Sequence, residues 1–316
     1  MRTQITNMNT PKVIFAGTPE FSVASLQALV ESGIVPVAVL TQPDRPAGRG
    51  KRLAQSPVKQ FAVTHSISVL QPPTLRDEGA VAELVALAAD IMIVAAYGLI
   101  LPQRVLDIPA AGCLNVHASL LPRWRGAAPI QAAILAGDDE TGVCLMSMTA
   151  GLDCGPVFAS EVVAIGAHET AGELHDRLAT TGAELLMRHL DDILSRRLKP
   201  KAQDEDQASY AAKTKTADAE LDWQRPAADL ERIVRAYDPA PGAWFMLDAE
   251  RIKCRLAYRV TGVEAAAGTI VDAGQGGIVI ACGDGAIGIN SLQRPGKRAV
   301  TAAEFATQFD LVGRQL

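Results

Sequence analysis

Two polar side chains interrupt the short apolar stretch Cys113–His117, just before it enters a loop closed by Pro122. Asn115 and His117 are two residues apart, so on a β-strand their side chains project from the same face. An amide donor beside a group that titrates near pH 7 suits chemistry in which a carbonyl oxygen gains negative charge while a proton moves. This pair is therefore the first candidate for a catalytic site.

A third candidate, Asp153, lies in the glycine-flanked turn 151–155, directly after a predicted strand. A loop at such a position can bring a carboxylate to a neighbouring strand end, as at the ligand crevices of open α/β sheets. The alternatives are that Asn-x-His is a structural pair and that Asp153 only forms its turn. We interpret the adjacent Cys154 as a packing residue, because nothing near it in the sequence indicates an activated thiolate.

Two basic segments are candidate contacts for nucleic acid. The first is the long polar loop 41–52, which we expect to be irregular because glycines and prolines interrupt it. Its cations outnumber its one anion, Asp44, and suit a phosphate backbone: Arg45, Arg49, Lys51 and Arg52. The second is the cluster 294–298, with Arg294, Lys297 and Arg298. The alternative for either segment is an ordinary solvated surface loop or turn.

The composition describes a globular protein large enough for two domains. The chain has 316 residues, of which 48 % are hydrophobic and 21 % charged. No apolar run reaches the length needed to cross a bilayer, and the polar start lacks the apolar core of a signal peptide. The five cysteines are scattered, which disfavours a disulfide framework or a zinc site and favours the cytoplasm. A net charge of −5 argues against nucleic acid wrapped over the whole surface but allows a local basic patch.

Strand and helix patterns alternate in the first part of the chain, which predicts a Rossmann-like, mostly parallel sheet covered by helices. Strands are expected at residues 12–16, 34–40, near 69, 90–96 and 113–117, with added edge strands at 141–148 and 157–165. The first strand leads into Gly17-Thr18-Pro19, where Thr18 is expected to cap a helix. The Gly-x-Gly-x-x-Gly fingerprint is absent, so we expect no NAD. Helices are expected at 19–32, 57–64, 78–89, 128–136 and 173–194.

The polar stretch 199–216 is predicted to be a linker, so that residues 1–198 form one domain and residues 217–316 a second. After a helix at 228–237 the second domain contains short strands separated by glycine-rich turns. This spacing is typical of a small, OB-like β-barrel. The strands are expected at 243–247, 251–260, 268–271, 277–281 and 286–292.

Several long motifs, in one order along the chain, are together far more specific than any of them alone. They are residues 15–21 (FAGTPEF), 41–51 (TQPDRPAGRGK), 96–102 (AYGLILP), 115–126 (NVHASLLPRWRG) and 151–155 (GLDCG). Over essentially its whole length the chain resembles the folate-dependent formyltransferase family. It departs from the family at Cys154, where threonine is frequent, and at 213–218 and 238–241.

The resemblance implies transfer of a formyl group from 10-formyltetrahydrofolate to the α-amino group of methionyl initiator tRNA, for translation initiation. The family's catalytic residues fall on Asn115, His117 and Asp153. On this chemistry Asn115 would donate a hydrogen bond to the oxyanion, and His117 would stabilise it and help move protons. Asp153 would hold His117 in a useful tautomer and accept the amine proton. The family's folate contacts fall on Tyr97, Gly98, Leu99, Ile100, Leu101, Ser119, Leu120, Leu121 and Pro122. Its tRNA-reading loop falls on residues 43–52, with its key arginine at Arg49, and we expect the barrel to bind tRNA with Lys297 and Arg298.

Alternatives remain open within the same family: formyl transfer to an amino sugar nucleotide or to glycinamide ribotide, or hydrolysis of the formylfolate. A pure RNA-binding protein is a different class, and it would not need Asn115, His117 and Asp153. The expected protein is a cytoplasmic monomer that uses no metal and binds no membrane.

Overall fold

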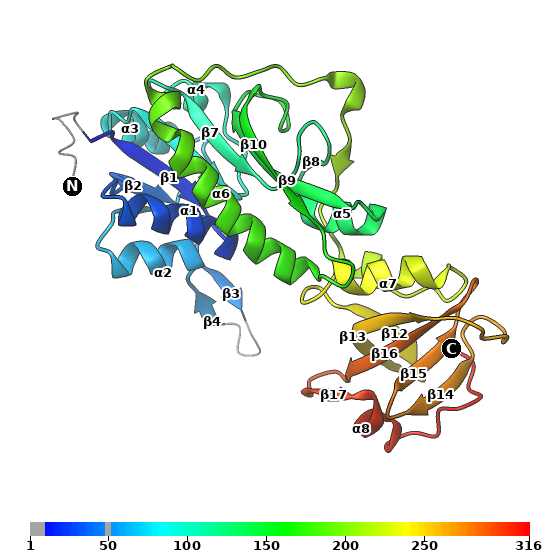
Figure 1. The fold of residues 1–316 in the computed structure, drawn as a ribbon. Coiled ribbons are helices and arrows are strands. Elements are labelled where there is room, and N and C mark those ends of the chain that lie inside the picture. The colour runs from blue at the N-terminus through cyan, green and yellow to red at the C-terminus, as the bar shows by residue number, and fades with distance from the viewer. Residues whose placement is uncertain (1–9, 48–51) are drawn as a thin grey trace, which may run out of the picture. The chain divides into compact units, whose positions relative to one another are not determined.

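The computed structural model describes residues 10–47 and 52–316 of the chain (Figure 1). The chain divides into two compact units. The first unit contains residues 1–126, 142–163 and 176–210, and the second contains residues 127–141, 164–175 and 211–316.

The first unit is built on a seven-stranded sheet in the order β10-β9-β7-β6-β1-β2-β5. The strands β5, β2, β1, β6 and β7 pair in parallel, and β9 pairs antiparallel with β7. The prediction of a mostly parallel sheet with added strands at one edge is thus confirmed. The bounds are β1 Val13–Gly17, β2 Ala38–Leu40, β5 Val69–Leu70, β6 Ile91–Ala95, β7 Cys113–His117, β9 Glu140–Ser147 and β10 Val157–Ala164.

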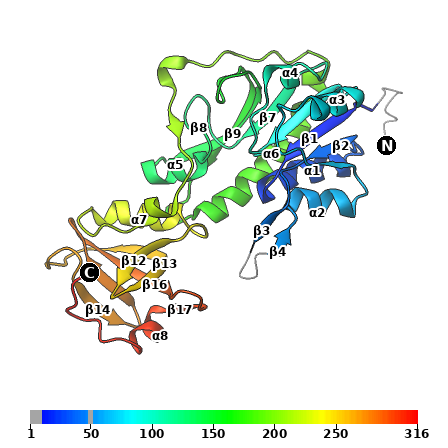
Figure 2. The same ribbon diagram turned by 180° about the vertical axis from the view of Figure 1, so that it is seen from behind.

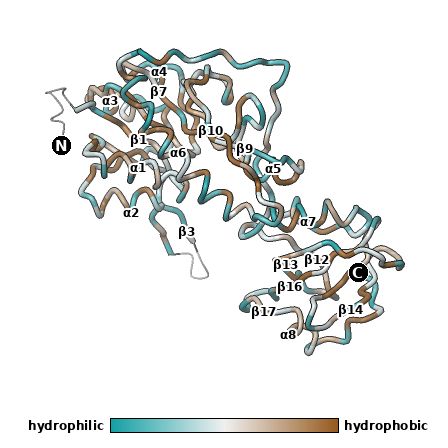
Figure 3. The backbone as a smooth tube through the Cα atoms, in the orientation of Figure 1, coloured by the Kyte–Doolittle hydropathy of each residue, from teal (hydrophilic) through white to brown (hydrophobic). Residues whose placement is uncertain are grey.

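Helices cover both faces of this sheet, with α1 and α6 nearer the viewer in Figure 1 and α3 nearer in Figure 2. Every residue of β1, β6 and β7 is consequently buried, as a parallel sheet between two helical layers requires. In Figure 3, brown marks hydrophobic residues, and it is prominent along these buried strands. The bounds are α1 Glu20–Glu31, α2 Pro57–Thr64, α3 Glu78–Ala86, α4 Gln103–Leu106 and α6 Ala171–Leu194. The sequence pattern did not predict the one-turn helix α4.

Helix α6 packs on one face of β7 through a glycine. A side chain at Gly182 would meet the methyl group of Val116 at 2.8 Å, so the two backbones approach closely there. Val116 lies between Asn115 and His117, and neighbouring side chains of a strand point to opposite faces. The face of β7 that carries Asn115 and His117 is therefore the one turned away from α6.

The second unit holds an antiparallel sheet, as predicted, in the order β12-β13-β16-β15-β14, with β17 on β16. Along one edge β16 changes partner, from β15 at residues 286–289 to β17 at residues 291–293, and β13 pairs with β12 at residues 250–254 and with β16 at residues 253–260. Such exchanges curl a small sheet toward a barrel. The bounds are α5 Pro129–Ala136, α7 Ala227–Ala236, β12 Ala243–Leu247, β13 Glu250–Val260, β14 Ile270–Gly274, β15 Gly277–Ala281, β16 Ala286–Gln293, β17 Ala299–Thr301 and α8 Ala302–Ala306. Its core includes Trp223, Phe245, Ile280, Leu292 and Phe305.

Two segments differ from their predicted irregular structure. Within the loop 41–52, β3 (Arg45–Ala47) pairs antiparallel with β4 (Arg52–Ala54). Residues 199–210, predicted as part of a linker, pack within the first unit: Lys201 forms a β-bridge with Val157, and the backbone amide of Arg125 donates to the Ser209 carbonyl at 2.8 Å. The short strands β8 (Arg125–Gly126) and β11 (Tyr210–Ala211) and the turn η1 (Glu205–Gln207) follow from this packing.

Candidate active site

Asn115 and His117 lie on the interior strand β7, whose backbone is held by β6 on one side and β9 on the other. Their side chains are 7 % and 6 % exposed. Among the described residues, none forms a hydrogen bond with the Asn115 side chain. An amide that is nearly buried but unpaired is suited to donate to a ligand oxygen, because it would need no reorganisation to do so.

The ring of His117 is oriented by a carbonyl group in the loop that follows β7. Its Nε2 lies 3.1 Å from the carbonyl oxygen of Trp124, and a hydrogen bond to that acceptor requires a proton on Nε2. The loop turns back on itself, since Trp124 has a φ of 61° and the Ser119 hydroxyl donates to the Arg123 carbonyl at 2.7 Å. In the neutral ring, Nδ1 therefore carries the lone pair.

Asp153 faces that lone pair, with its Oδ2 3.8 Å from His117 Nδ1. The carboxylate is 15 % exposed, and Oδ2 also accepts a hydrogen bond from the Gly126 amide at 2.8 Å. Asp153 occupies the left-handed region, with a φ of 49°, in the loop between β9 and β10. A non-glycine residue in that region carries backbone strain, and such strain is concentrated at functional sites. The structure thus brings together the three side chains that the sequence singled out.

The loop carrying Asp153 is tied to β9 at Gly155, which is buried. A side chain at Gly155 would overlap the carbonyl oxygen of Ser147, the last residue of β9. We expect Gly155→Ala to destabilise the protein by about 1–3 kcal/mol, as overpacking of an interior typically does. Thermal unfolding measures this. The matched control is Gly151→Ala, whose new methyl group would meet the flexible Cys154 side chain. If both variants lost the same free energy of unfolding, the close contact between Gly155 and Ser147 would not be what stabilises the loop.

The carboxyl end of β6, where folate contacts are expected, is organised around the backbone of Tyr97. Its carbonyl oxygen accepts from the Thr18 hydroxyl at 2.8 Å and from the Gln42 amide at 3.0 Å. The prediction that Thr18 caps a helix is therefore wrong: Pro19 precedes α1 and no side chain caps it. Gly98 has a φ of 82°, and a side chain there would overlap the Gln42 amide.

The predicted folate positions divide into buried and open side chains. Tyr97, Leu101 and Ser119 are 2 %, 7 % and 0 % exposed. Burial raises the pKa of the Tyr97 hydroxyl to about 12. Ile100, by contrast, is 80 % exposed. Half-buried apolar side chains lie in the loop after β7 and at β6: Leu99, Leu120, Leu121 and Pro122. Of the predicted folate positions, these side chains keep apolar area accessible to a ligand, whereas the buried ones shape the backbone.

Of the four predicted tRNA contacts in the loop 41–52, Arg45 and Arg52 are exposed on the hairpin formed by β3 and β4. Arg49 and Lys51 lie outside the described residues. Asp44 at the base of the hairpin does not neutralise these arginines, because Lys59 and Gln71 hold its carboxylate at 2.7 and 2.8 Å. The hydrogen bonds from Lys59 and Gln71 also hold the pKa of Asp44 below its ordinary value.

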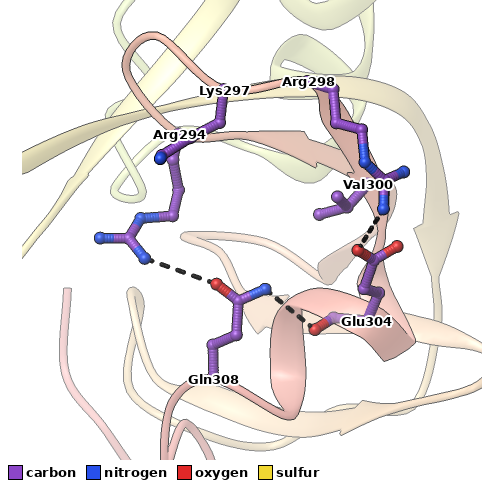
Figure 4. A pocket seen from close by; sticks show the side chains of 6 residues that line it. All are labelled: Arg294, Lys297, Arg298, Val300, Glu304 and Gln308. Atoms are coloured by element: carbon purple, nitrogen blue, oxygen red, sulfur yellow. Dashed lines mark hydrogen bonds and ion pairs between the residues drawn. The ribbon is translucent and has the colours of Figure 1, made fainter.

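Lys297 and Arg298 line a pocket in the second unit, together with Arg294, Val300, Glu304 and Gln308 (Figure 4). Arg298 is paired with Glu304 at 2.6 Å, and Arg294 with Glu250 at 2.7 Å. In the part of the chain that the structure describes, the Lys297 ammonium has no such partner. Of the predicted contacts in this unit, Lys297 is therefore the cation most open to a phosphate.

All five cysteines are free, and burial raises the pKa of Cys113 to about 12 and of Cys144 to about 11. The Cys154 thiol contacts the Thr149 hydroxyl at 3.4 Å. Within residues 10–47 and 52–316, no three histidine, cysteine or acidic side chains gather as metal ligands. None of the helices in those ranges combines the length and apolar character needed to span a membrane.

Two family models match the chain and together cover the seven-stranded and the six-stranded sheet. The model described as formyl transferase matches residues 11–190, and the one described as formyl transferase, C-terminal domain, matches residues 213–310. The chain belongs to the formyl transferase family.

Its similar relatives define the branch of that family. The methionyl-tRNA formyltransferase of Thiobacillus denitrificans is 54 % identical over 307 residues, covering 96 % of this chain and 97 % of the relative. That of Stutzerimonas stutzeri is 53 % identical over 285 residues, covering 90 % of each chain.

Solved structures share the fold at low sequence identity. The N-formyltransferase of Helicobacter canadensis, in complex with folinic acid and dTDP-3-aminofucose, is 18 % identical with a TM-score of 0.67, covering 90 % of this chain and 99 % of its own. A structure of HypX from Aquifex aeolicus with tetrahydrofolic acid is also 18 % identical, with a TM-score of 0.65. The match covers 98 % of this chain, which corresponds to 49 % of the HypX chain.

Proposed function

We propose that this chain transfers the formyl group of 10-formyltetrahydrofolate to the α-amino group of methionyl initiator tRNA, as the name of its relatives indicates. The observation that carries the proposal is the convergence of His117 Nδ1 and Asp153 Oδ2, 3.8 Å apart, beside the unpaired amide of Asn115. Acyl transfer to an amine needs a hydrogen-bond donor to the oxyanion, a base for the amine proton and a carboxylate that stabilises the protonated base.

In the mechanism we propose, the methionyl amine attacks the formyl carbon and its electron pair forms the new C–N bond. The carbonyl oxygen becomes an oxyanion, to which the Asn115 amide donates a hydrogen bond. The Nδ1 lone pair of His117 takes the amine proton, and Asp153 stabilises the resulting imidazolium. The oxyanion then collapses, the bond to the folate nitrogen breaks, and the proton passes to that nitrogen.

The structure suggests different roles for two groups than the sequence does. The tautomer of His117 is set by the Trp124 carbonyl at 3.1 Å, rather than by Asp153. Asp153 is then left to act on the charged form of the ring, because it faces the atom that gains the proton. We accordingly assign the amine proton to His117 and not to Asp153.

We propose that the folate lies against the carboxyl ends of β6 and β7, with Ile100 and residues 120–122 as its apolar contacts. Residues 1–198, together with the segment 199–210 that packs within the first unit, would form the catalytic domain, 211–216 the connection and 217–316 the tRNA-binding domain. Arg45, Arg49, Lys51, Arg52, Lys297 and Arg298 would contact tRNA phosphates. The protein would work as a monomer in the cytoplasm, where translation initiates.

Incubation of the purified protein with 10-formyltetrahydrofolate and methionyl initiator tRNA tests the proposal. We expect formylmethionyl-tRNA to accumulate, and none to form when tetrahydrofolate replaces the formyl donor. Parallel reactions offer a dTDP-amino sugar, glycinamide ribotide or no acceptor. Faster turnover with the amino sugar or with glycinamide ribotide would make that compound the acceptor instead of tRNA. Release of formate without any acceptor would make the protein a hydrolase of the formylfolate.

If tRNA is the formyl acceptor and the loop 43–52 contacts it, Arg49→Ala should affect the use of tRNA alone. Loss of one phosphate contact should raise the KM for tRNA and reduce the slope of log K against log salt by about 1, while the KM for folate stays unchanged. Steady-state kinetics at several salt concentrations measure both quantities. The control is Arg197→Ala, which removes a 64 % exposed arginine paired with Asp192. If Arg49→Ala changes both substrates' KM equally, the loop does not read tRNA.

A further inference from the structure

The segment 203–209 supplies side chains to the candidate active site, although the sequence gives it the character of a linker. The Gln203 amide nitrogen donates to the carbonyl oxygens of Asp153 and Gly155, at 2.8 and 2.7 Å. These two hydrogen bonds hold the backbone of the turn on both sides of Cys154. Asp153 has a φ of 49°, so an external restraint is what keeps this conformation populated.

The other end of Gln203 is fixed by a buried cation. Its amide oxygen accepts from Nε and a terminal nitrogen of Arg125 at 3.0 and 2.9 Å. Arg125 is 1 % exposed, and its two terminal nitrogens also bind the Glu205 carboxylate at 2.8 Å each. Hydrogen bonding to Arg125 lowers the pKa of Glu205, so the carboxylate stays charged in this pair. A buried guanidinium with all these partners has one orientation.

Arg125 also lies next in the chain to the residue that holds the Asp153 carboxylate. The Gly126 amide donates to Asp153 Oδ2 at 2.8 Å, and the Arg125 amide donates to the Ser209 carbonyl at the same distance. The Trp124 amide donates to the Ser209 hydroxyl at 3.0 Å, while the Trp124 carbonyl binds His117. Residues 124–126, which include β8, are thus positioned by the segment 203–209; of these, Trp124 positions His117 and Gly126 positions Asp153.

We propose that Gln203 is a positioning residue for the reaction: through Arg125 on one side and the Asp153 turn on the other, it holds the Asp153 carboxylate opposite His117. This inference rests on the proposed function, since it assigns Asp153 its catalytic role. Gln203 touches neither substrate in this scheme. Its effect should therefore be confined to kcat and disappear when Asp153 is absent.

The test compares Gln203→Ala with Gln207→Ala, which makes the same change in the same segment, at a side chain whose amide donates to Asp204 at 2.7 Å. We expect Gln203→Ala to lower kcat about 10²-fold with little change in either KM, because a displacement of about 1 Å in a reacting group costs that much. Gln207→Ala should leave kcat unchanged. Because Gln203→Ala can also weaken folding, Gln203→Glu is the second variant: it keeps the acceptor for Arg125 and lacks the two donors.

A double-mutant cycle separates positioning from general destabilisation. In an Asp153→Ala background, adding Gln203→Ala should lower kcat no further. An activity-independent measurement is amide hydrogen exchange at Gly126, which should become faster in Gln203→Ala and Gln203→Glu but not in Gln207→Ala. Additive losses of kcat, or unchanged exchange at Gly126 in both Gln203 variants, would overturn the proposal. Formylation by the wild type in the same assay shows that the proposed function itself holds.

Discussion

Replacement of Asn115 by alanine is expected to lower kcat for formyl transfer by about 10²–10³, because one preorganised donor to an oxyanion typically contributes that factor. The substrate carbonyl carries little negative charge before attack, so the lost hydrogen bond matters mainly in the transition state. The KM for folate and for tRNA should therefore change little. Steady-state kinetics with each substrate varied in turn measure the three constants.

The fold should survive this substitution. The Asn115 side chain has no hydrogen-bond partner among the described residues, so alanine leaves no other buried group unpaired. The matched control is Asn290→Ala, which removes the same side chain from an exposed position of β16. A kcat close to that of the wild type, at an unchanged melting temperature, would remove Asn115 from the mechanism.

How far the sequence predicts this site depends on how local each signal is. Asn115 and His117 share a face because a strand alternates with a period of two, and that pattern needs no tertiary information. The buried strands and their parallel pairing likewise follow from continuous apolar runs. Asp153 is different: its turn can be predicted, but its approach to His117 depends on a loop that returns over β7, which no local pattern specifies.

The wrong prediction for Thr18 and the missed role of Gln203 both result from tertiary contacts that local patterns do not specify. Thr18 has the residue type of a helix cap, but a tertiary acceptor, the Tyr97 carbonyl, competes successfully for its hydroxyl. The segment 199–210 lacks hydrophobic periodicity because it packs through side-chain amides and backbone groups rather than through an apolar face. Gln203 was therefore missed. The one available signal was Arg125, a cation inside the motif 115–126 that needs an anion once it is buried.

The site as a whole combines a rigid strand with a strained loop. Asn115 and His117 are fixed by β7, at the centre of three paired strands, whereas Asp153 lies in a loop and receives hydrogen bonds from Gly126 and Gln203. Asp153, which must respond to a proton on His117, therefore lies on a loop that hydrogen bonds hold in place. Substitution of Asp153 tests the proton chemistry without disturbing β7.

Replacement of Asp153 by asparagine is expected to lower kcat by about 10²–10⁴, the range attributed to a positioned proton-transfer group. Asp153 Oδ2 both accepts from the Gly126 amide and faces His117 Nδ1, and the amide oxygen of asparagine can take that position, so the loop remains in place. The atom opposite His117 Nδ1 is then a neutral amide oxygen instead of a carboxylate oxygen. The variant has no charge with which to stabilise the imidazolium, so the loss acts on the chemical step.

Single-turnover measurements with both substrates bound distinguish this loss from a loss of binding, because they report the chemical step directly. Asp310→Asn, at an exposed position of the second unit, makes the same change as a control. If Asp153→Asn retained the wild-type rate, the imidazolium would need no carboxylate, and the 3.8 Å approach of Asp153 to His117 would be a structural contact only. A lower rate with unchanged substrate affinities would instead place the charge of Asp153 in the transition state, next to a ring whose other nitrogen is already committed to the Trp124 carbonyl.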